Sequence, residues 1–234
     1  MTSSKFSIIG MGVCVGTAED LAALDKIIFD GEHTFSNVEV SGSSLYAGFL
    51  PEAERADVSG NSLLARVVAE AIADTNSDLV LSDCSVILIS NGRASKHGIY
   101  NSEVGVTSAA ALESECKTLL RVENVGAALN AVPYVQDKSS SKAVVIAALN
   151  LMNQSILESK SSIKDFPRFS VQEAPTLAYD ESNPSTLYGE GAAAIVLFGE
   201  SSEMPRAYSS VEALSIEEPE TLDRGSMVEV LSAS

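Results

Sequence analysis

Few residues have types and spacings that could support catalysis or ligand binding. The first such group is a set of glycines near the N-terminus. Gly10, Gly12 and Gly16 follow a short apolar run that starts at Phe6. Glycines between a strand and a helix let the backbone approach the pyrophosphate of a dinucleotide. The spacing here is GxGxxxG, whereas the dinucleotide fingerprint is GxGxxG, and the next convincing strand begins only near Ser85. A tight strand-to-helix turn is the favoured interpretation, with dinucleotide binding as the alternative.

Nucleophilic and basic side chains are scattered along the chain. The three cysteines, Cys14, Cys84 and Cys116, form no CxxC pair and no metal-ligand spacing, which favours free thiols in a reducing cytoplasm. The two histidines, His33 and His97, lie far apart, so we expect no histidine-based metal site. The GxSxG motif of hydrolases and the GxxxxGK[ST] phosphate loop do not occur. We therefore expect neither a metal nor a cofactor.

Composition and charge exclude several classes of partner. The chain has 234 residues, 45% of them hydrophobic, and 15 basic against 32 acidic side chains give a formal charge of −17. Such a surface repels nucleic-acid phosphates and anionic membranes. The longest apolar runs, 143–149 and 192–198, are far shorter than the ~20 residues of a membrane-spanning helix, and the N-terminus has no signal-peptide pattern. A globular cytoplasmic protein is expected.

The elements that must position any site alternate between strands and helices. Apolar runs predict buried strands, and apolar residues at helical spacing predict helices. Such an alternation indicates an α/β fold whose sheet is covered on both faces. The expected strands cover 6–12, 85–90, 117–123, 142–149, 192–198 and 207–216, and the expected helices cover 17–30, 62–76, 125–136 and 149–161.

Local signals refine these expectations. Thr17 is expected to cap the first helix, with Asp20 in the capping-box position, and Gly31 to end it. Arg66 and Glu70 are spaced for an i,i+4 pair. Pro133 weakens the helix that begins near 125. The segment 32–60 is expected to be a long excursion with short strands, and 162–190 a long surface crossing.

One motif is more specific. Tyr179-Asp180-Glu181 precedes Gly189-Glu190-Gly191-Ala192-Ala193, and the pair resembles the F-D-x…G-x-G-E-G-A-A-x-x-V-L signature of β-ketoacyl synthases, the condensing enzymes of the thiolase fold. The runs 8–12 and 144–151 resemble two further landmarks of that family, in the same order. The resemblance implies a thiolase-like half-domain, a layered α/β structure with a five-stranded mixed sheet. It covers residues 5 to about 216, so we expect a domain over 1–216 and an acidic tail or linker over 217–234.

The resemblance also implies where a nucleophile would be. The family places a cysteine at a strand-to-helix elbow in a sequence like D-T-A-C-S-S-S-L. The matching stretch here is 121–129, and the elbow falls on Gly126 or an immediate neighbour, with no cysteine near it. The family's C-terminal half, with two histidines and a lysine, has no counterpart in these residues. The resemblance therefore assigns no catalytic residue, and Asp180, Gly189, Glu190 and Gly191 are family-motif residues with structural roles.

The stretch 122–132 is most similar to the degenerate ketosynthase-like region in the acyltransferase-bearing subunit of bacterial polyunsaturated fatty acid synthases. This similarity implies a non-catalytic module of a fatty acid or polyketide synthase that acts in assembly or docking. Its partners would be other synthase subunits and acyl carrier protein. Because the family dimerises through the strand before the nucleophile, a homodimer or pseudo-dimer through 117–123 is expected. Two alternatives stay open: a condensing acyltransferase completed by a second chain, with Cys116 or Cys84 acylated, and an unrelated cofactor-binding α/β protein.

Overall fold

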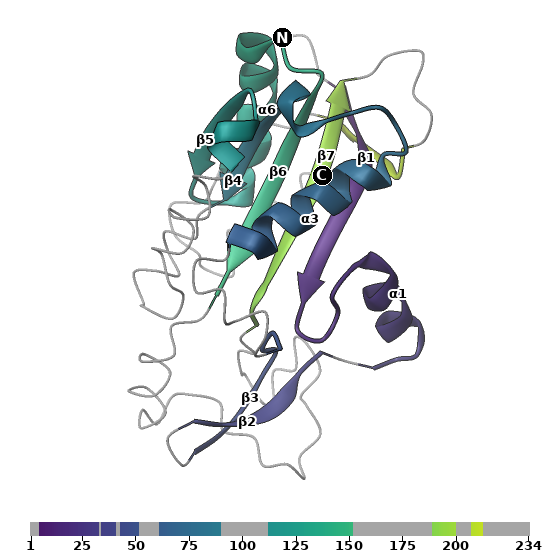
Figure 1. Cartoon of the computed structure of the whole chain (residues 1–234), viewed down its shortest axis with the longest axis vertical. Helices are drawn as coiled ribbons and strands as arrows, with labels where there is room; N and C mark the ends of the chain where they lie inside the picture. Colours follow the sequence, from purple (N-terminus) through teal and green to yellow (C-terminus); the bar gives the residue numbers. More distant parts are fainter. Residues whose placement is uncertain are drawn as a thin grey trace, which may run out of the picture.

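A six-stranded mixed sheet organises the chain (Figure 1). The computed structural model describes residues 5–32, 34–40, 43–51, 61–89, 112–151, 189–199 and 207–212, and all structural statements concern these residues. The strand order is β5-β4-β6-β7-β1-β8, in which β4 is parallel to β5 and β6, while β7 is antiparallel to both β6 and β1. The strands are β1 (Lys5–Val15), β4 (Cys84–Ile89), β5 (Thr118–Val122), β6 (Ala143–Asn150), β7 (Gly191–Gly199) and β8 (Ser209–Glu212).

The expected mixed sheet is confirmed, with one strand more than the five that the family resemblance implies. The additional strand is β8, which pairs antiparallel with the first residues of β1, Lys5–Ile8. The other five strands are adjacent to one another in the sheet, in the order β5-β4-β6-β7-β1. The predicted boundaries of β4, β5, β6 and β7 agree with the structure within one residue, and for β4, β6 and β7 the signal is a continuous apolar run.

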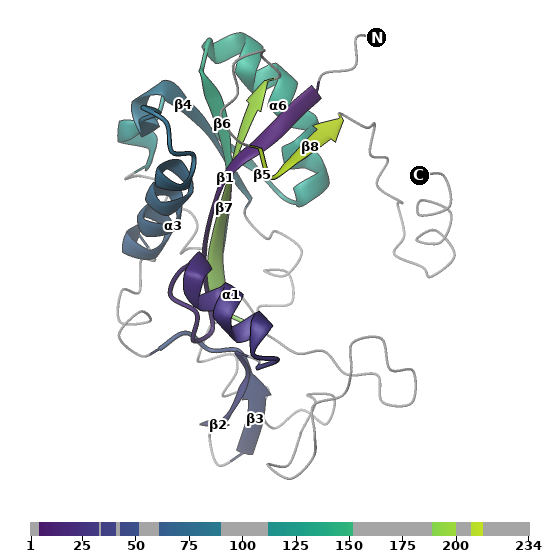
Figure 2. The same ribbon diagram turned by 90° about the vertical axis from the view of Figure 1, so that its right-hand side faces the viewer.

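Two helices cover opposite faces of the sheet, as Figure 2 shows. Helix α3 (Asn61–Asp74) packs on the face to which Val86 and Leu88 point, and α6 (Val125–Ser139) packs on the face of Ile87 and Ile89. Side chains alternate between the faces of a strand, so β4, buried at every residue, contributes to both cores. Each fully buried Leu or Val contributes about 1.5–3 kcal/mol by leaving water. The expectation of a sheet covered on both faces is confirmed.

The glycines of β1 have a different role from the one expected. Gly10 and Gly12 lie inside β1, not in a turn after it, so both the tight-turn interpretation and the dinucleotide alternative are wrong for them. A Cβ at Gly10 would lie 2.1 Å from the Ala71 carbonyl oxygen, and one at Gly12 would lie 2.1 Å from that of Val67. The two glycines therefore let α3 approach the backbone of β1, and no space is left there for a pyrophosphate.

The turn itself falls at Gly16, whose φ of +52° favours glycine. Helix α1 (Leu21–Phe29) begins later than expected because β1 continues to Val15, and its cap is Asp20 rather than Thr17. The Asp20 carboxylate accepts a 2.7 Å hydrogen bond from the backbone N–H of Ala23. Gly31 follows the helix end with φ +69°, as predicted.

Helix α3 is also held to β1 by hydrogen bonds. The Asp74 carboxylate accepts from the backbone N–H of Met11, and the Glu70 carboxylate accepts from that of Val13, both at 3.0 Å. Glu70 also accepts from the Leu21 N–H at the start of α1, at 2.8 Å. These carboxylates satisfy backbone donors on the side of β1 that does not pair with β7. The i,i+4 spacing of Arg66 and Glu70 predicted a surface pair, whereas the Glu70 carboxylate accepts hydrogen bonds from β1 and α1 and so connects α3 to both.

The remaining described elements agree with the sequence pattern in outline. The expected short strands between 32 and 60 are β2 (Ser36–Val40) and β3 (Ser43–Ala47), which pair antiparallel. A single 3-10 turn, η1 (Leu81–Asp83), precedes β4. Helix α6 continues through Pro133 to Ser139, beyond the predicted end, and Val135 after the proline is buried against the sheet. The helix predicted over 149–161 is wrong at its first two residues, which belong to β6, and its residues 152–161 lie outside the described residues, as do most of the crossing at 162–190 and the tail at 217–234.

Candidate functional site

The candidate site is the edge of the sheet at which β1, β4, β5 and β6 end. These four strands run in one direction, since β1 and β6 are both antiparallel to β7. Ligands of α/β sheets bind at the carboxyl ends of the strands. Helix α6 begins at this edge after β5, and β7 enters the sheet here through the Gly189-Glu190-Gly191 motif. The structure thus places Gly126, at the start of α6, and the glycine–glutamate motif at the same edge of the sheet, with β4 and β6 between the strands that they adjoin.

The start of α6 is a well-formed strand-to-helix elbow. Asn124 is the N-cap, and its side-chain Oδ1 accepts a 2.7 Å hydrogen bond from the Ala127 N–H. Gly126 is the second residue of the helix and has no positive φ, so the turn into the helix precedes it. A side chain at this position would lie in the positive potential of the helix N-terminus, which lowers the pKa of a thiol. Glycine has no side chain for that potential to act on.

Two of the three thiols lie at the opposite edge of the sheet. Cys84 is the first residue of β4, and Cys116 precedes β5, whereas Asn124 follows its end. Burial raises the pKa of the Cys84 thiol to about 11 and also raises the pKa of Cys116. Both thiols are therefore protonated at neutral pH, the form that does not attack a thioester. This position and protonation disfavour the alternative in which Cys84 or Cys116 is acylated.

The third thiol, Cys14, is fully buried in β1. The Nη2 of Arg66 donates a hydrogen bond to its Sγ at 3.0 Å. A guanidinium favours a thiolate, yet a side chain with 0% exposure meets a reagent only when the structure opens locally. Cys14 therefore belongs to the interface between β1 and α3.

The glycine–glutamate motif forms the entry of β7 into the sheet. Gly189 forms a bridge with Gly48, and the Glu190 N–H donates a 2.7 Å hydrogen bond to the Gly48 carbonyl. A Cβ at Gly191 would lie 2.7 Å from the Cys14 carbonyl oxygen, whereas a Cβ at Gly189 would lie 3.8 Å from its nearest neighbour among the described residues, the Gly48 carbonyl oxygen. Only the second glycine of the motif is thus required by close packing, here against β1.

Glu190 is an almost fully buried carboxylate, with 3% of its surface exposed. Its Oε2 accepts a 3.2 Å hydrogen bond from the backbone N–H of Leu50. A buried carboxylate is tolerated where donors replace the water that it has lost. Glu190 thereby joins the start of β7 to the chain that follows β3, which supports a structural role.

A cavity of about 300 Å³ lies beside this motif. Most of its lining is apolar or glycine, from the end of β1, the ends of the β2–β3 hairpin, the end of β6 and the start of β7. The lining residues are Val15, Gly16, Thr34, Phe35, Gly48, Ala148, Asn150, Gly189, Glu190, Gly191, Ala192 and Ala193. No cysteine, histidine or lysine is among these described lining residues.

Three residues singled out in the sequence, Asp180, His33 and His97, lie outside the described residues. Within the described part, no cluster of three His, Cys, Asp or Glu side chains is arranged to hold a metal ion. No helix among the described residues combines the length and hydropathy needed to cross a membrane.

Sequence reasoning missed two groups near this edge. The carboxylates of Glu70 and Asp74 connect α3 to β1, and the only available signal was their i,i+4 spacing on the polar face of the helix. Gly48 was also missed, although it faces Gly189 across a bridge, because nothing in its local sequence indicates a distant backbone neighbour.

Comparison with known proteins gives a consistent picture of the fold. No protein-family model matches the chain, and no curated protein matches it. Among solved structures, it is similar to a type II polyketide synthase ketosynthase in complex with its acyl carrier protein (AntDE:AntF), with a TM-score of 0.64, 13% identity, and coverage of 85% of this chain and 59% of the other. It is also similar to the PfaC ketosynthase–chain length factor, with a TM-score of 0.57, 15% identity, and coverage of 89% and 30%.

A third similar structure is a β-ketoacyl synthase from Burkholderia phymatum STM815, with a TM-score of 0.57, 16% identity, and coverage of 84% of this chain and 59% of the other. The described sheet order, the helices on both faces and these neighbours define a ketosynthase-like fold of the thiolase type. The chain spans between about a third and three fifths of the length of these neighbours.

Proposed function

We propose that this chain is a non-catalytic ketosynthase-like module of a fatty acid or polyketide synthase, of the polyunsaturated fatty acid type, that acts in assembly or docking. The observation that carries the proposal is the start of α6. A strand-to-helix elbow is present with its Asn124 cap, yet the position that would carry the nucleophile is Gly126. The thiols of Cys84 and Cys116 lie at the other edge of the sheet with raised pKa values.

The proposed partners are other synthase subunits and acyl carrier protein. Two similar structures support this choice, because one is described as a ketosynthase with its acyl-carrier protein and another as a ketosynthase–chain length factor. The proposed contact surface is β5, which is an edge strand of the sheet. An edge strand carries backbone donors and acceptors that another strand can pair with.

Acylation measured by intact mass tests the non-catalytic assignment. After incubation with a short-chain acyl-CoA near neutral pH, we expect the mass of the full chain to stay unchanged. The matched variant Gly126→Cys places a thiol at the helix N-terminus, where its pKa falls, and we expect it to react with iodoacetamide faster than Cys116 does. A native chain that gains one acyl group would refute the proposal.

The docking role needs its own measurement. Full-length chain mixed with the ketosynthase, acyltransferase and carrier subunits of the same synthase should form a complex that survives gel filtration. The variant Leu120→Pro interrupts β5 and should weaken that complex, because proline has no N–H and does not fit a paired strand. A native chain that binds none of these subunits, nor itself, would contradict an assembly role.

A further inference from the structure

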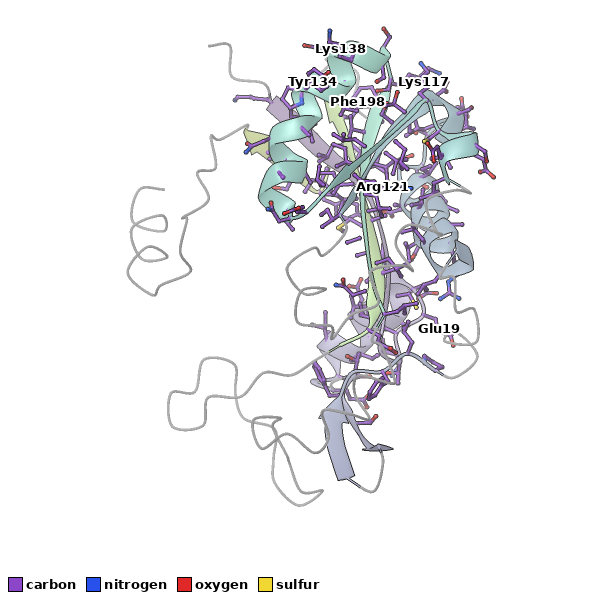
Figure 3. The ribbon with its side chains drawn as sticks, turned by 90° about the vertical axis from the view of Figure 1, so that its left-hand side faces the viewer. Glu19, Lys117, Arg121, Tyr134, Lys138 and Phe198 are labelled. Carbon is purple, nitrogen blue, oxygen red and sulfur yellow. The ribbon has the colours of Figure 1, made fainter. Side chains whose placement is uncertain are left out.

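Two of the three thiols, Cys84 and Cys116, are neighbours across the starts of β4 and β5. The Lys117 N–H donates a 2.9 Å hydrogen bond to the Cys84 carbonyl, and the parallel pairing of the two strands continues from there. Cys116 is therefore one residue before the position that lies beside Cys84. Figure 3 shows Lys117 at the same end of the molecule as Lys138, which belongs to the last turn of α6.

Both cysteine side chains are on the α3 face of the sheet. Cys84 belongs to the buried cluster under α3, and Cys116 packs against the same cluster. The chain bends before β5, because the Cys116 N–H still donates a 2.9 Å hydrogen bond to the Leu112 carbonyl, as in a helical turn. The next side chain, Lys117, instead reaches the Ser140 carbonyl at the end of α6. The bend thus turns Cys116 to the face of Cys84, although the two residues are not in register.

The separation of the two residues suits a disulfide bond. Neighbouring strands lie about 4.8 Å apart and successive Cα atoms about 3.8 Å apart, so a diagonal of this kind corresponds to about 6 Å between the two Cα atoms. Disulfides join Cα atoms that are about 4.4–6.8 Å apart. Burial is the largest cause that raises the pKa of the Cys84 thiol, followed by the charge of Asp83 and then by Cys116. An interaction between the two sulfur atoms supports their proximity.

The two thiols differ in their access to solvent. Cys84 has 0% exposure, and its Sγ donates to the Val80 carbonyl at 3.4 Å, whereas Cys116 is half-buried. A solute therefore meets Cys116 first, and Cys84 is the thiol beside it. The third thiol, Cys14, is in β1, which β6 and β7 separate from β4.

We propose that Cys84 and Cys116 form a redox-modification site, which a low-molecular-weight disulfide such as oxidised glutathione converts into an intramolecular disulfide. The Cys116 thiolate attacks one sulfur of the oxidant, forms a mixed disulfide and releases one glutathione thiolate. The Cys84 thiolate then attacks the Cys116 sulfur and displaces the second glutathione thiolate. The two cysteine protons pass to the released thiolates, so the chain loses two hydrogens and the oxidant is reduced to two glutathione thiols.

The rate of this reaction depends on pH. Burial raises the pKa of the Cys116 thiol, against the backbone N–H groups around it, which lower it. Little thiolate is therefore present at neutral pH, and the reaction should be slow there. We expect its rate to rise about tenfold per pH unit up to about pH 9, since the thiolate is the attacking species.

The disulfide would join β4 to the segment that leads into β5, an edge strand of the sheet. It closes the chain between residues 84 and 116, which reduces the conformational entropy of the unfolded state. The oxidised chain should therefore unfold at a higher urea concentration than the reduced chain. A lower midpoint after oxidation would contradict a link that the native fold accommodates.

Mass spectrometry of the full-length chain tests the site directly. The reduced chain is incubated with excess oxidised glutathione at about pH 8.5, quenched with acid and measured intact and after tryptic digestion without reductant. We expect a native chain that is two hydrogens lighter and carries no glutathione. Trypsin cleaves after Arg66, Arg93, Lys96 and Lys117, so peptides 67–93 and 97–117 should be recovered joined to each other.

Three variants separate the steps. Cys84→Ala keeps the accessible thiol and removes the second one, so a stable mixed disulfide should accumulate on Cys116. Cys116→Ser removes the accessible thiol and should stay unmodified over the time in which the native chain is oxidised. Cys14→Ala is the matched control, since it removes the remaining thiol and should form the same link as the native chain.

The outcomes are independent of the docking role, which is measured by complex formation. A native chain that keeps glutathione on Cys116 without forming the link would overturn the proposal, because Cys84 would then be out of reach. A native chain of unchanged mass would also overturn it, provided that Cys116 is alkylated by iodoacetamide in urea. A link that includes Cys14 would contradict the pairing of Cys84 with Cys116.

Discussion

The close approach of α3 to β1 makes Gly12→Ala the most informative single substitution. The added Cβ would lie 2.1 Å from the Val67 carbonyl oxygen and 2.8 Å from the Ala71 backbone nitrogen, where ordinary contact begins at 3.4 Å. The overlap with the first atom is therefore 3.4 − 2.1 = 1.3 Å. Both clashing atoms belong to the backbone of a helix, so no side-chain rotation relieves them, and α3 must move as a unit.

The cost of that movement follows from what α3 contacts. Overpacking in a core costs about 1–3 kcal/mol. A shift of more than 1 Å also breaks the 3.0 Å hydrogen bond from the Val13 N–H to the Glu70 carboxylate, and hydrogen bonds to charged groups contribute about 1.5–3 kcal/mol. The two effects together predict a loss of about 3–5 kcal/mol in the free energy of unfolding.

Urea denaturation followed by far-UV circular dichroism measures this loss. Gly189→Ala is the matched control, because within the described part of the chain its Cβ would have no neighbour closer than 3.8 Å, and we expect a change of less than about 1 kcal/mol. A Gly12→Ala variant as stable as the native chain would refute the packing argument, and with it the explanation of why glycine occurs inside β1.

Three further predictions use the same structure. Gly191→Ala should destabilise the chain by about 1–3 kcal/mol in urea denaturation, more than Gly189→Ala, because only at Gly191 does the Cβ meet backbone, at 2.7 Å. Asp74→Ala should cost about 1.5–3 kcal/mol, since its carboxylate accepts from the Met11 N–H, and Asp74→Asn should cost less; equal losses would contradict a role for the charge. The pKa of Cys84 rises from 9.0 to about 11 on folding, so the unfolded chain ionises first and stability should fall between pH 9 and 11. Urea denaturation midpoints measured between pH 9 and 11 should decrease less steeply with pH in Cys84→Ala than in the native chain. An equally steep decrease would contradict burial of the neutral thiol.

Continuous apolar runs predicted the central strands well. β4 and β6 are buried on both faces, and a strand of this kind needs no particular neighbour to be recognised from its own residues. The helix α3 was also predictable, because its apolar residues recur at helical spacing and five of them are buried. The landmark motifs then indicated a thiolase-like α/β fold with a mixed sheet, which the structure and its neighbours confirm.

Roles that depend on a distant neighbour were not predictable from the local sequence. Gly10 and Gly12 have the spacing of a phosphate-binding turn, yet the atoms that require glycine belong to a helix more than fifty residues away. Thr17 has the residue type of a helix cap, but the extension of β1 and the turn at Gly16 move the cap to Asp20. In both cases the local pattern was compatible with two structures, and a long-range contact selected one.

The amino-acid sequence by itself determined the strand and helix set, the acidic surface and the glycine at position 126, because these depend only on residue type and periodicity. Only the tertiary structure decided that Cys14, near the edge that the elbow before α6 faces, is fully buried, and that Cys84 and Cys116 lie at the opposite edge with raised pKa values. The physical reason is that the periodicity of apolar residues specifies which face of a helix or strand is buried. It does not specify which other element packs against that face, and this depends on the tertiary structure. The function proposed for this chain depends on tertiary packing, since a thiol is reactive only where its surroundings stabilise the thiolate.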